Sequence, residues 1–96
     1  MIIVHIEHPI HSFATWKKAF DSDPAGRERS GVRRYQILRP IDDPNYVMID
    51  LDFESTTVAE AFLATMREVW QSTTAKAALT DSPRTRIVEV VESKEY

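Results

Sequence analysis

The stretch from residue 31 to residue 53 constrains the fold more than any other part of the sequence. Within it, residues 46–53 alternate in polarity, with one parity formed by Val47, Ile49, Leu51 and Phe53 and the other by Tyr46, Met48, Asp50 and Asp52. Period-two alternation with β-branched and aromatic residues predicts a strand with one buried face. Residues 40–45 are rich in proline, aspartate and asparagine, which favour tight turns. We therefore expect a hairpin whose first strand covers residues 32–38.

Two further strands and two helices are expected around this hairpin. Residues 1–7 alternate in the same way and end before Pro9, and residues 84–91 form the last strand. Ser12 is a suitable N-cap for a first helix, in which Phe13, Trp16 and Phe20 form one stripe. A second helix is predicted from the capping box at 57–60 and from apolar residues at helical spacing up to position 70. Residues 73–79 could add a short helical piece.

The order strand, helix, strand, strand, helix, strand is typical of the α+β ferredoxin-like βαββαβ fold. Right-handed crossovers then predict a four-stranded antiparallel sheet of order 4-1-3-2, with both helices on one face. The alternative is an open α+β sheet of another strand order. The length of 96 residues predicts a single domain spanning 1–96.

The bulk composition restricts the partners and the compartment. The net charge of −3 gives no overall attraction to nucleic acid or to anionic membranes. The sequence holds no cysteine, so disulfides and thiol chemistry are excluded. The apolar run at the N-terminus is too short for a signal peptide or a membrane span. We therefore expect a cytoplasmic protein that contacts neither nucleic acid nor membrane.

The two faces of the predicted sheet differ in polarity. The face expected under the helices is apolar and carries Ile2, Val4, Ile6, Val47, Ile49, Leu51, Phe53, Val88 and Val90. The opposite face is mixed and carries Ile3, His5, Glu7, Met48, Asp50, Asp52, Ile87 and Glu89. Because such a face is too apolar for open water and too polar for a dry core, we expect a homodimer in which two sheets enclose a half-polar cavity.

This pattern resembles the dimeric α+β barrel superfamily, which includes antibiotic-biosynthesis monooxygenases, haem-degrading enzymes, muconolactone isomerases, polyketide cyclases and stress-responsive barrel proteins. The segments SFATWKKAFDSDPAGRERSGVRRYQILRP and DDPNYVMIDLDF are similar to those of a small bacterial group in it without an assigned activity. The resemblance covers nearly the whole chain and implies a dimeric α+β barrel. Haem-degrading members have a histidine ligand on or after the second helix, whereas all three histidines here precede residue 12. No cofactor is therefore expected.

His5 and Asp50 are the candidate catalytic pair, since both are expected on the mixed face of neighbouring strands. A carboxylate beside an imidazole orients the ring and favours its charged form. The alternative is a satisfied polar pair with no chemistry. The candidate ligand-binding residues around the pair are Ile3, Arg34, Tyr35, Met48 and Arg86. No metal site is expected, because His5 and His8 point to opposite faces of a strand.

Arginines are concentrated in residues 27–39. They could receive an anionic group or form a solvated surface paired with Glu28, Asp42 and Asp43.

These observations leave three hypotheses for the function. The first is a protein that binds a small, partly apolar ligand inside the barrel. The second is a cofactor-independent monooxygenase, cyclase or isomerase acting on an aromatic or polyketide-like substrate. The third is a purely structural dimer. The sequence carries no motif that decides whether the protein is an enzyme.

Overall fold

The computed structural model describes residues 1–72 and 81–96. The chain order is β1 (Ile2–Pro9), α1 (Phe13–Asp21), β2 (Arg34–Leu38), β3 (Tyr46–Phe53), α2 (Thr56–Val69) and β4 (Arg84–Glu89). This is the predicted order of elements, and β3 has the predicted bounds. The helical piece expected at residues 73–79 lies outside the described residues.

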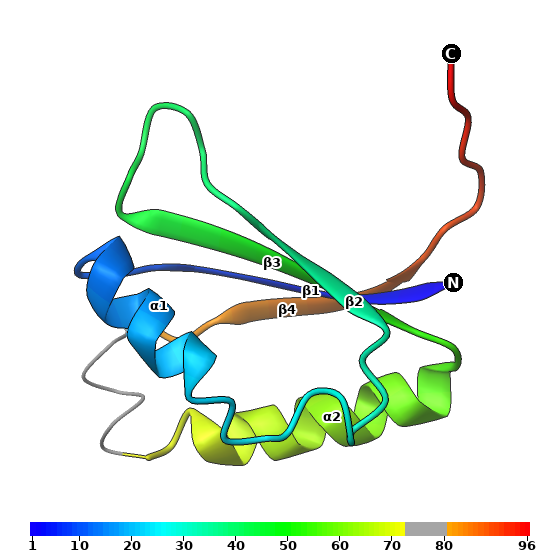
Figure 1. Ribbon diagram of the computed structural model, residues 1–96, viewed down its shortest axis with the longest axis horizontal. Coiled ribbons are helices and arrows are strands. Elements are labelled where there is room, and N and C mark those ends of the chain that lie inside the picture. The colour runs from blue at the N-terminus through cyan, green and yellow to red at the C-terminus, as the bar shows by residue number, and fades with distance from the viewer. Residues whose placement is uncertain (73–80) are drawn as a thin grey trace.

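The four strands form one antiparallel sheet of order β2-β3-β1-β4, which is the predicted order. The two central strands, β1 and β3, pair over their full length, from Ile2 opposite Phe53 to Pro9 opposite Tyr46. Both helices lie on the same side of the sheet (Figure 1). We call the covered side the helix face and the other side the open face. The fold is therefore ferredoxin-like, as expected.

The helix starts show how local chemistry sets the boundaries. α1 begins after Ser12 as predicted, and the Ser12 hydroxyl accepts a hydrogen bond of 3.1 Å from the Thr15 amide. The predicted capping box of α2 is wrong, because Ser55 and not Thr57 is the N-cap. The Ser55 hydroxyl accepts from the Val58 amide at 3.3 Å. Three consecutive hydroxyl residues, 55–57, could each cap a helix, and their pattern does not distinguish between them.

The strand ends also differ from the prediction. β1 continues through Pro9, and the Ile10 amide still donates to the Asn45 carbonyl at 2.8 Å. β2 begins at Arg34 instead of residue 32, after Gly31 has turned the chain with φ of +96°. A Cβ at Gly31 would lie 2.6 Å from a Val58 methyl group, so the approach of this turn to α2 requires glycine.

The core lies between the helix face and the two helices. From the sheet it takes Val4, Ile6, Val47, Ile49, Leu51 and Phe53, and from the helices Trp16, Ala59, Phe62 and Leu63, all of them buried. Phe20 and Met66 are partly buried against this cluster. The alternation of β1 and β3 therefore buries the apolar parity that the sequence predicted.

The expected orientation of β4 is wrong. Ile87 pairs with Val4 and Glu89 with Ile2, so both lie on the helix face, whereas Val88 pairs with Ile3 on the open face. Val90 follows the end of β4 and is 43% exposed, which is inconsistent with the expected position under the helices. The physical reason is that residues 87, 88, 90 and 91 are all apolar, so both parities of this strand fit a buried face.

No helix within residues 1–72 and 81–96 combines the length and the apolar character needed to cross a membrane.

Truncating Leu63 to Ala should lower the free energy of unfolding by about 2–5 kcal/mol, because it leaves a cavity beside buried side chains. The control is Ile41→Ala in a fully exposed turn, expected to change it by less than about 0.5 kcal/mol. Urea denaturation of both variants at one protein concentration measures the difference. Equal losses would show that the helix face of the sheet is not the core.

Candidate functional site

The open face carries a chain of hydrogen bonds between side chains of β1 and β3. His5 Nδ1 lies 2.6 Å from Asp50 Oδ1, and His5 Nε2 lies 2.8 Å from Glu7 Oε2. The Tyr46 hydroxyl donates to the other oxygen of Glu7 at 2.8 Å. These four side chains, Asp50, His5, Glu7 and Tyr46, are named here the His5 network. The His5–Asp50 pair predicted from the sequence is therefore brought together.

The His5 network fixes the protonation of its imidazole. Both ring nitrogens face carboxylate oxygens, which accept hydrogen bonds, so only the doubly protonated ring satisfies both. Burial lowers the pKa of His5, but the hydrogen bonds and charges of Glu7 and Asp50 outweigh it and raise the pKa above 6.5. The hydrogen bonds from His5 and then from Tyr46 lower the pKa of the Glu7 carboxyl. The bond to Glu7 raises the pKa of Tyr46.

This geometry bears on the catalytic role predicted for His5. A general base needs an unprotonated nitrogen within reach of the substrate. Here both nitrogens of His5 are occupied, so the ring could accept a proton only after Glu7 leaves Nε2. A catalytic role of His5 and Asp50 remains a prediction, and it requires a ligand that displaces Glu7.

Four of the five predicted ligand-binding residues share the open face with the His5 network. Arg86 pairs with His5 across β1 and β4, and Ile3 and Met48 lie on the same face of the two central strands. Arg34 pairs with Asp52, to which it also forms an ion pair of 3.3 Å. Tyr35 is not brought to this face.

Tyr35 pairs with Leu51 and therefore lies on the helix face, at the β2 edge. Its ring meets the Phe20 ring edge-on at a centroid distance of 5.1 Å. The expectation that Tyr35 would join His5 and Asp50 is corrected by this register. The alternation of residues 32–39 left the inward face of β2 undefined, because both parities contain arginine and an apolar residue.

The helix face holds a cavity of about 70 Å³ between the sheet, α1, α2 and the segment 23–27. Its aromatic lining consists of Trp16, Phe20, Phe62 and Trp70, and its polar lining consists of His8, Asp23 and Arg27. Both tryptophans of the sequence are among these residues. A mainly apolar recess with a few convergent polar groups is the usual form of a small-molecule site.

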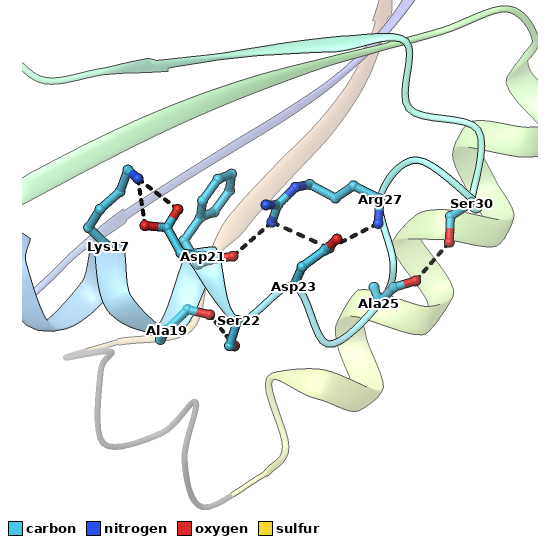
Figure 2. A network of polar contacts seen from close by, with 9 residues as sticks. Lys17, Ala19, Asp21, Ser22, Asp23, Ala25, Arg27 and Ser30 are labelled. Carbon is cyan, nitrogen blue, oxygen red and sulfur yellow. Dashed lines mark hydrogen bonds and ion pairs between the residues drawn. The ribbon is translucent and has the colours of Figure 1, made fainter.

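The segment that follows α1 closes one side of this cavity and is held by local hydrogen bonds (Figure 2). Arg27 donates from Nη1 to the Phe20 carbonyl at 2.9 Å, and its amide donates to Asp23 Oδ1 at 2.9 Å. The Ser30 hydroxyl donates to the Ala25 carbonyl at 2.8 Å. These bonds keep the segment compact.

The guanidinium of Arg27 also stacks over two aromatic rings. It lies 3.9 Å from the centroid of Phe20 and 5.2 Å from that of Tyr35. It forms an ion pair of 3.6 Å with Asp23 as well. Arg33 and Arg34 form ion pairs with Glu54 and Asp52. These arginines are therefore paired surface charges, but their partners are not the expected Glu28, Asp42 and Asp43.

His8 is the residue of this cavity that sequence reasoning missed as a functional candidate. It pairs with Val47 on the helix face and is only 2% exposed. The sequence indicates its burial only through its position in the strand alternation. His8 shares its face of the strand with Val4 and Ile6, which are expected in the core. A histidine among buried apolar residues is informative because burial of a polar group requires compensation.

Metal chemistry has no support in the described part of the chain. Within residues 1–72 and 81–96, no group of three His, Cys, Asp or Glu side chains is arranged to hold a metal ion. His5 and His8 lie on opposite faces of β1.

The His5 network should make stability depend on pH. Because folding raises the pKa of His5, its contribution is complete below its ordinary pKa of 6.5 and is lost as the pH rises through the folded value. Folding lowers the pKa of Glu7, so its contribution is present above 4.5 and is lost as the pH falls through the folded value. The His5 network should therefore stabilise the folded protein most between pH 4.5 and pH 6.5, the ordinary pKa values of the two groups.

We expect His5→Gln to lower the urea midpoint more at about pH 5.5 than at about pH 9. His11→Gln, at an exposed position, is the control and should give a small difference at both pH values. A difference for His5→Gln that is equal or larger at the higher pH contradicts the doubly protonated ring.

Several solved structures share the fold, whereas no protein-family model and no curated protein sequence matches the chain. SnoaB of Streptomyces nogalater, described as a cofactor-independent oxygenase, superposes with a TM-score of 0.75 at 16% identity, over 96% of this chain and 94% of that chain. A structure described as an antibiotic biosynthesis monooxygenase has a TM-score of 0.69 at 12% identity, over 96% of this chain and 100% of that chain. A dimeric ferredoxin-like protein from an uncultured marine organism has a TM-score of 0.67 at 10% identity, over 97% of both chains. The likeness is one of fold, and it agrees with the dimeric α+β barrel resemblance of the sequence.

Proposed function

We propose that this protein is a homodimer that binds a compact aromatic ligand in the cavity on the helix face. The observation that carries the proposal is the cavity lining, which combines the rings of two tryptophans and two phenylalanines with the polar side chains of His8, Asp23 and Arg27. Aromatic walls favour a flat apolar ligand through stacked and edge-on contacts. A small number of polar groups then fixes its orientation.

The size of the cavity limits the ligand. Pockets that enclose drug-sized ligands usually have about 300–1,000 Å³, and this one has about 70 Å³. One ring is therefore the part that enters, and any larger part of the molecule lies outside. This differs from the sequence-based expectation of a ligand inside the barrel, because the aromatic lining lies on the other face of the sheet.

The enzymatic form of the proposal is a cofactor-independent oxygenase, cyclase or isomerase that acts on this aromatic group. It draws on the description of SnoaB as a cofactor-independent oxygenase. Binding without turnover would support the non-catalytic form. Conversion of a bound phenol to an oxygenated product under air would support the enzymatic form.

Filling the cavity should weaken ligand binding. Ala25 lines the cavity and packs against the core, so Ala25→Leu should weaken binding of 4-nitrotoluene at least about tenfold by occupying its space. Quenching of Trp16 and Trp70 fluorescence by the nitroaromatic compound measures the affinity, because both rings line the cavity.

Ala64→Leu makes the same change at an exposed position of α2 and should keep wild-type affinity. Equal affinities of the two variants would exclude this cavity as the binding site.

The homodimer is proposed from the surface of the open face. Neither α1 nor α2 covers this face, and Leu38 and Val88 on it are 41% and 38% exposed. The C-terminal residues extend away from the rest of the chain (Figure 1), with Val91 and Tyr96 almost fully exposed. A second copy packed on the open face and against this tail would bury both sets of apolar side chains. One structure of the same fold is described as dimeric.

Replacing Met48 by Lys should convert the dimer to monomer or aggregate, because Met48 lies on a central strand of the open face. Light scattering at tens of micromolar measures the mass. Ala61→Lys on the exposed side of α2 is the control and should leave the dimer intact. A monomeric wild-type protein would rule the dimer out.

A second candidate site is the space enclosed between the two open faces of such a dimer. The hydrogen bond between His5 and Asp50 favours it, since a ligand that replaced Glu7 on His5 would meet an oriented imidazole. Ile3, Met48, Arg34 and Arg86 would then be its surroundings, as expected from the sequence. Loss of binding in His5→Gln but not in Ala25→Leu would favour this site over the helix-face cavity.

A further inference from the structure

Two hydrogen-bond donors of the open face converge on the carboxylate of Glu7. His5 approaches Oε2 through Nε2 at 2.8 Å, and the Tyr46 hydroxyl donates to Oε1 at 2.8 Å. Each carboxylate oxygen therefore has its own donor. The donor on His5 is charged, because Asp50 holds the other ring nitrogen at 2.6 Å. Hydrogen bonds from a charged donor to a carboxylate are stronger than those between neutral groups. His5 and Tyr46 thus form a carboxylate-binding pair that holds a side chain of the same protein.

The surroundings of this pair carry more positive than negative charge. β4 places Arg84 opposite Glu7 and Arg86 opposite His5, so both arginines lie on the open face. Among residues 1–72 and 81–96, Arg86 forms no ion pair. Three cationic side chains therefore stand against the carboxylates of Glu7 and Asp50. The imbalance favours one further anion at this position.

Glu7 lies where a ligand can replace it. The side chains of His5 and Glu7 are 30% and 28% exposed, so the hydrogen bond between them is reached from the surface of the open face. Arg84 lies opposite Glu7 in the register of β1 and β4 and offers the displaced carboxylate another partner. The exchange therefore leaves no carboxylate without a cation.

Apolar side chains adjoin the carboxylate-binding pair on the same face. Met48 lies opposite Glu7, and Ile3 lies opposite Val88 on the other side of His5. A ligand whose carboxylate meets His5 would place the rest of its body against these side chains. Burial of apolar ligand surface there would offset the competition from Glu7.

We propose that His5 and Tyr46 bind the carboxylate of a small, partly apolar acid, and that Glu7 occupies their hydrogen bonds when no ligand is bound. The inference rests on the second candidate site of the proposed function, because it names the class of ligand for the open face. The exchange changes hydrogen bonds and no covalent bond. The proton stays on Nε2, so His5 acts here as a donor and not as a general base.

The test compares benzoate with benzamide, which has a similar shape and no charge. A titration followed through the amide resonances of β1 and β3, at constant ionic strength, measures both affinities. Wild-type protein should bind benzoate at least about tenfold more tightly than benzamide. His5→Gln removes the charged donor and should weaken benzoate binding about tenfold. His11→Gln, at an exposed position, is the control and should keep wild-type affinity.

Removing the internal competitor gives a second readout. Glu7→Ala frees both donors and should strengthen benzoate binding about five- to tenfold, while benzamide binding changes less than about twofold. Glu60→Ala removes the same charge from an exposed position of α2 and should keep wild-type affinity. Glu7→Gln keeps the shape of the side chain without its charge and should give a smaller gain. It also serves if the Ala variant does not fold.

The outcomes separate this inference from the proposed cavity on the helix face. Benzoate that binds Glu7→Ala but not the wild-type protein, or that binds His5→Gln as tightly as wild type, overturns the carboxylate site. Neither result changes the binding of 4-nitrotoluene expected in the cavity. Wild-type protein that binds benzoate as expected and does not bind 4-nitrotoluene would overturn the cavity and support the carboxylate site.

Discussion

Pairing between β1 and β3 is the constraint on which the rest of the structure depends. The two strands run antiparallel in register over their full length at the centre of the sheet. Because successive side chains of a strand point to opposite faces, this register decides which residues the helices bury. A shift by one residue would expose Val4 and bury His5.

The alternation of side chains along β1 also places its two histidines on opposite faces, where their surroundings favour different protonation states. His5, on the open face, lies between two carboxylates, which favour the charged ring. His8, three residues later on the helix face, is bound to a backbone carbonyl within an aromatic cavity, which favours the neutral ring. One strand thus supplies a charged group for the surface on which we propose dimerisation and a neutral polar group for the proposed ligand site.

Sequence reasoning succeeded where polarity alternates without ambiguity. β3 and the parity of β1 were predicted, because their polar and apolar residues separate cleanly, and the order of elements then gave the sheet topology. It failed at β4, where neighbouring positions 87 and 88 are both apolar, and at Tyr35, because either parity of β2 could face inward. The cavity was missed for another reason. Its lining comes from β1, β3, both helices and a loop, and only tertiary packing brings His8 next to Trp16 and Arg27.

A long-range ¹H–¹⁵N spectrum of the histidine side chains at about pH 6 tests the central claim most directly. The account predicts a neutral His8 protonated on Nδ1 alone and a His5 protonated on both nitrogens. A doubly protonated His8, or a His8 protonated on Nε2, would contradict the neutral ring that donates from Nδ1 to the Pro9 carbonyl. A neutral His5 at this pH would contradict the doubly protonated ring inferred from its two carboxylate partners.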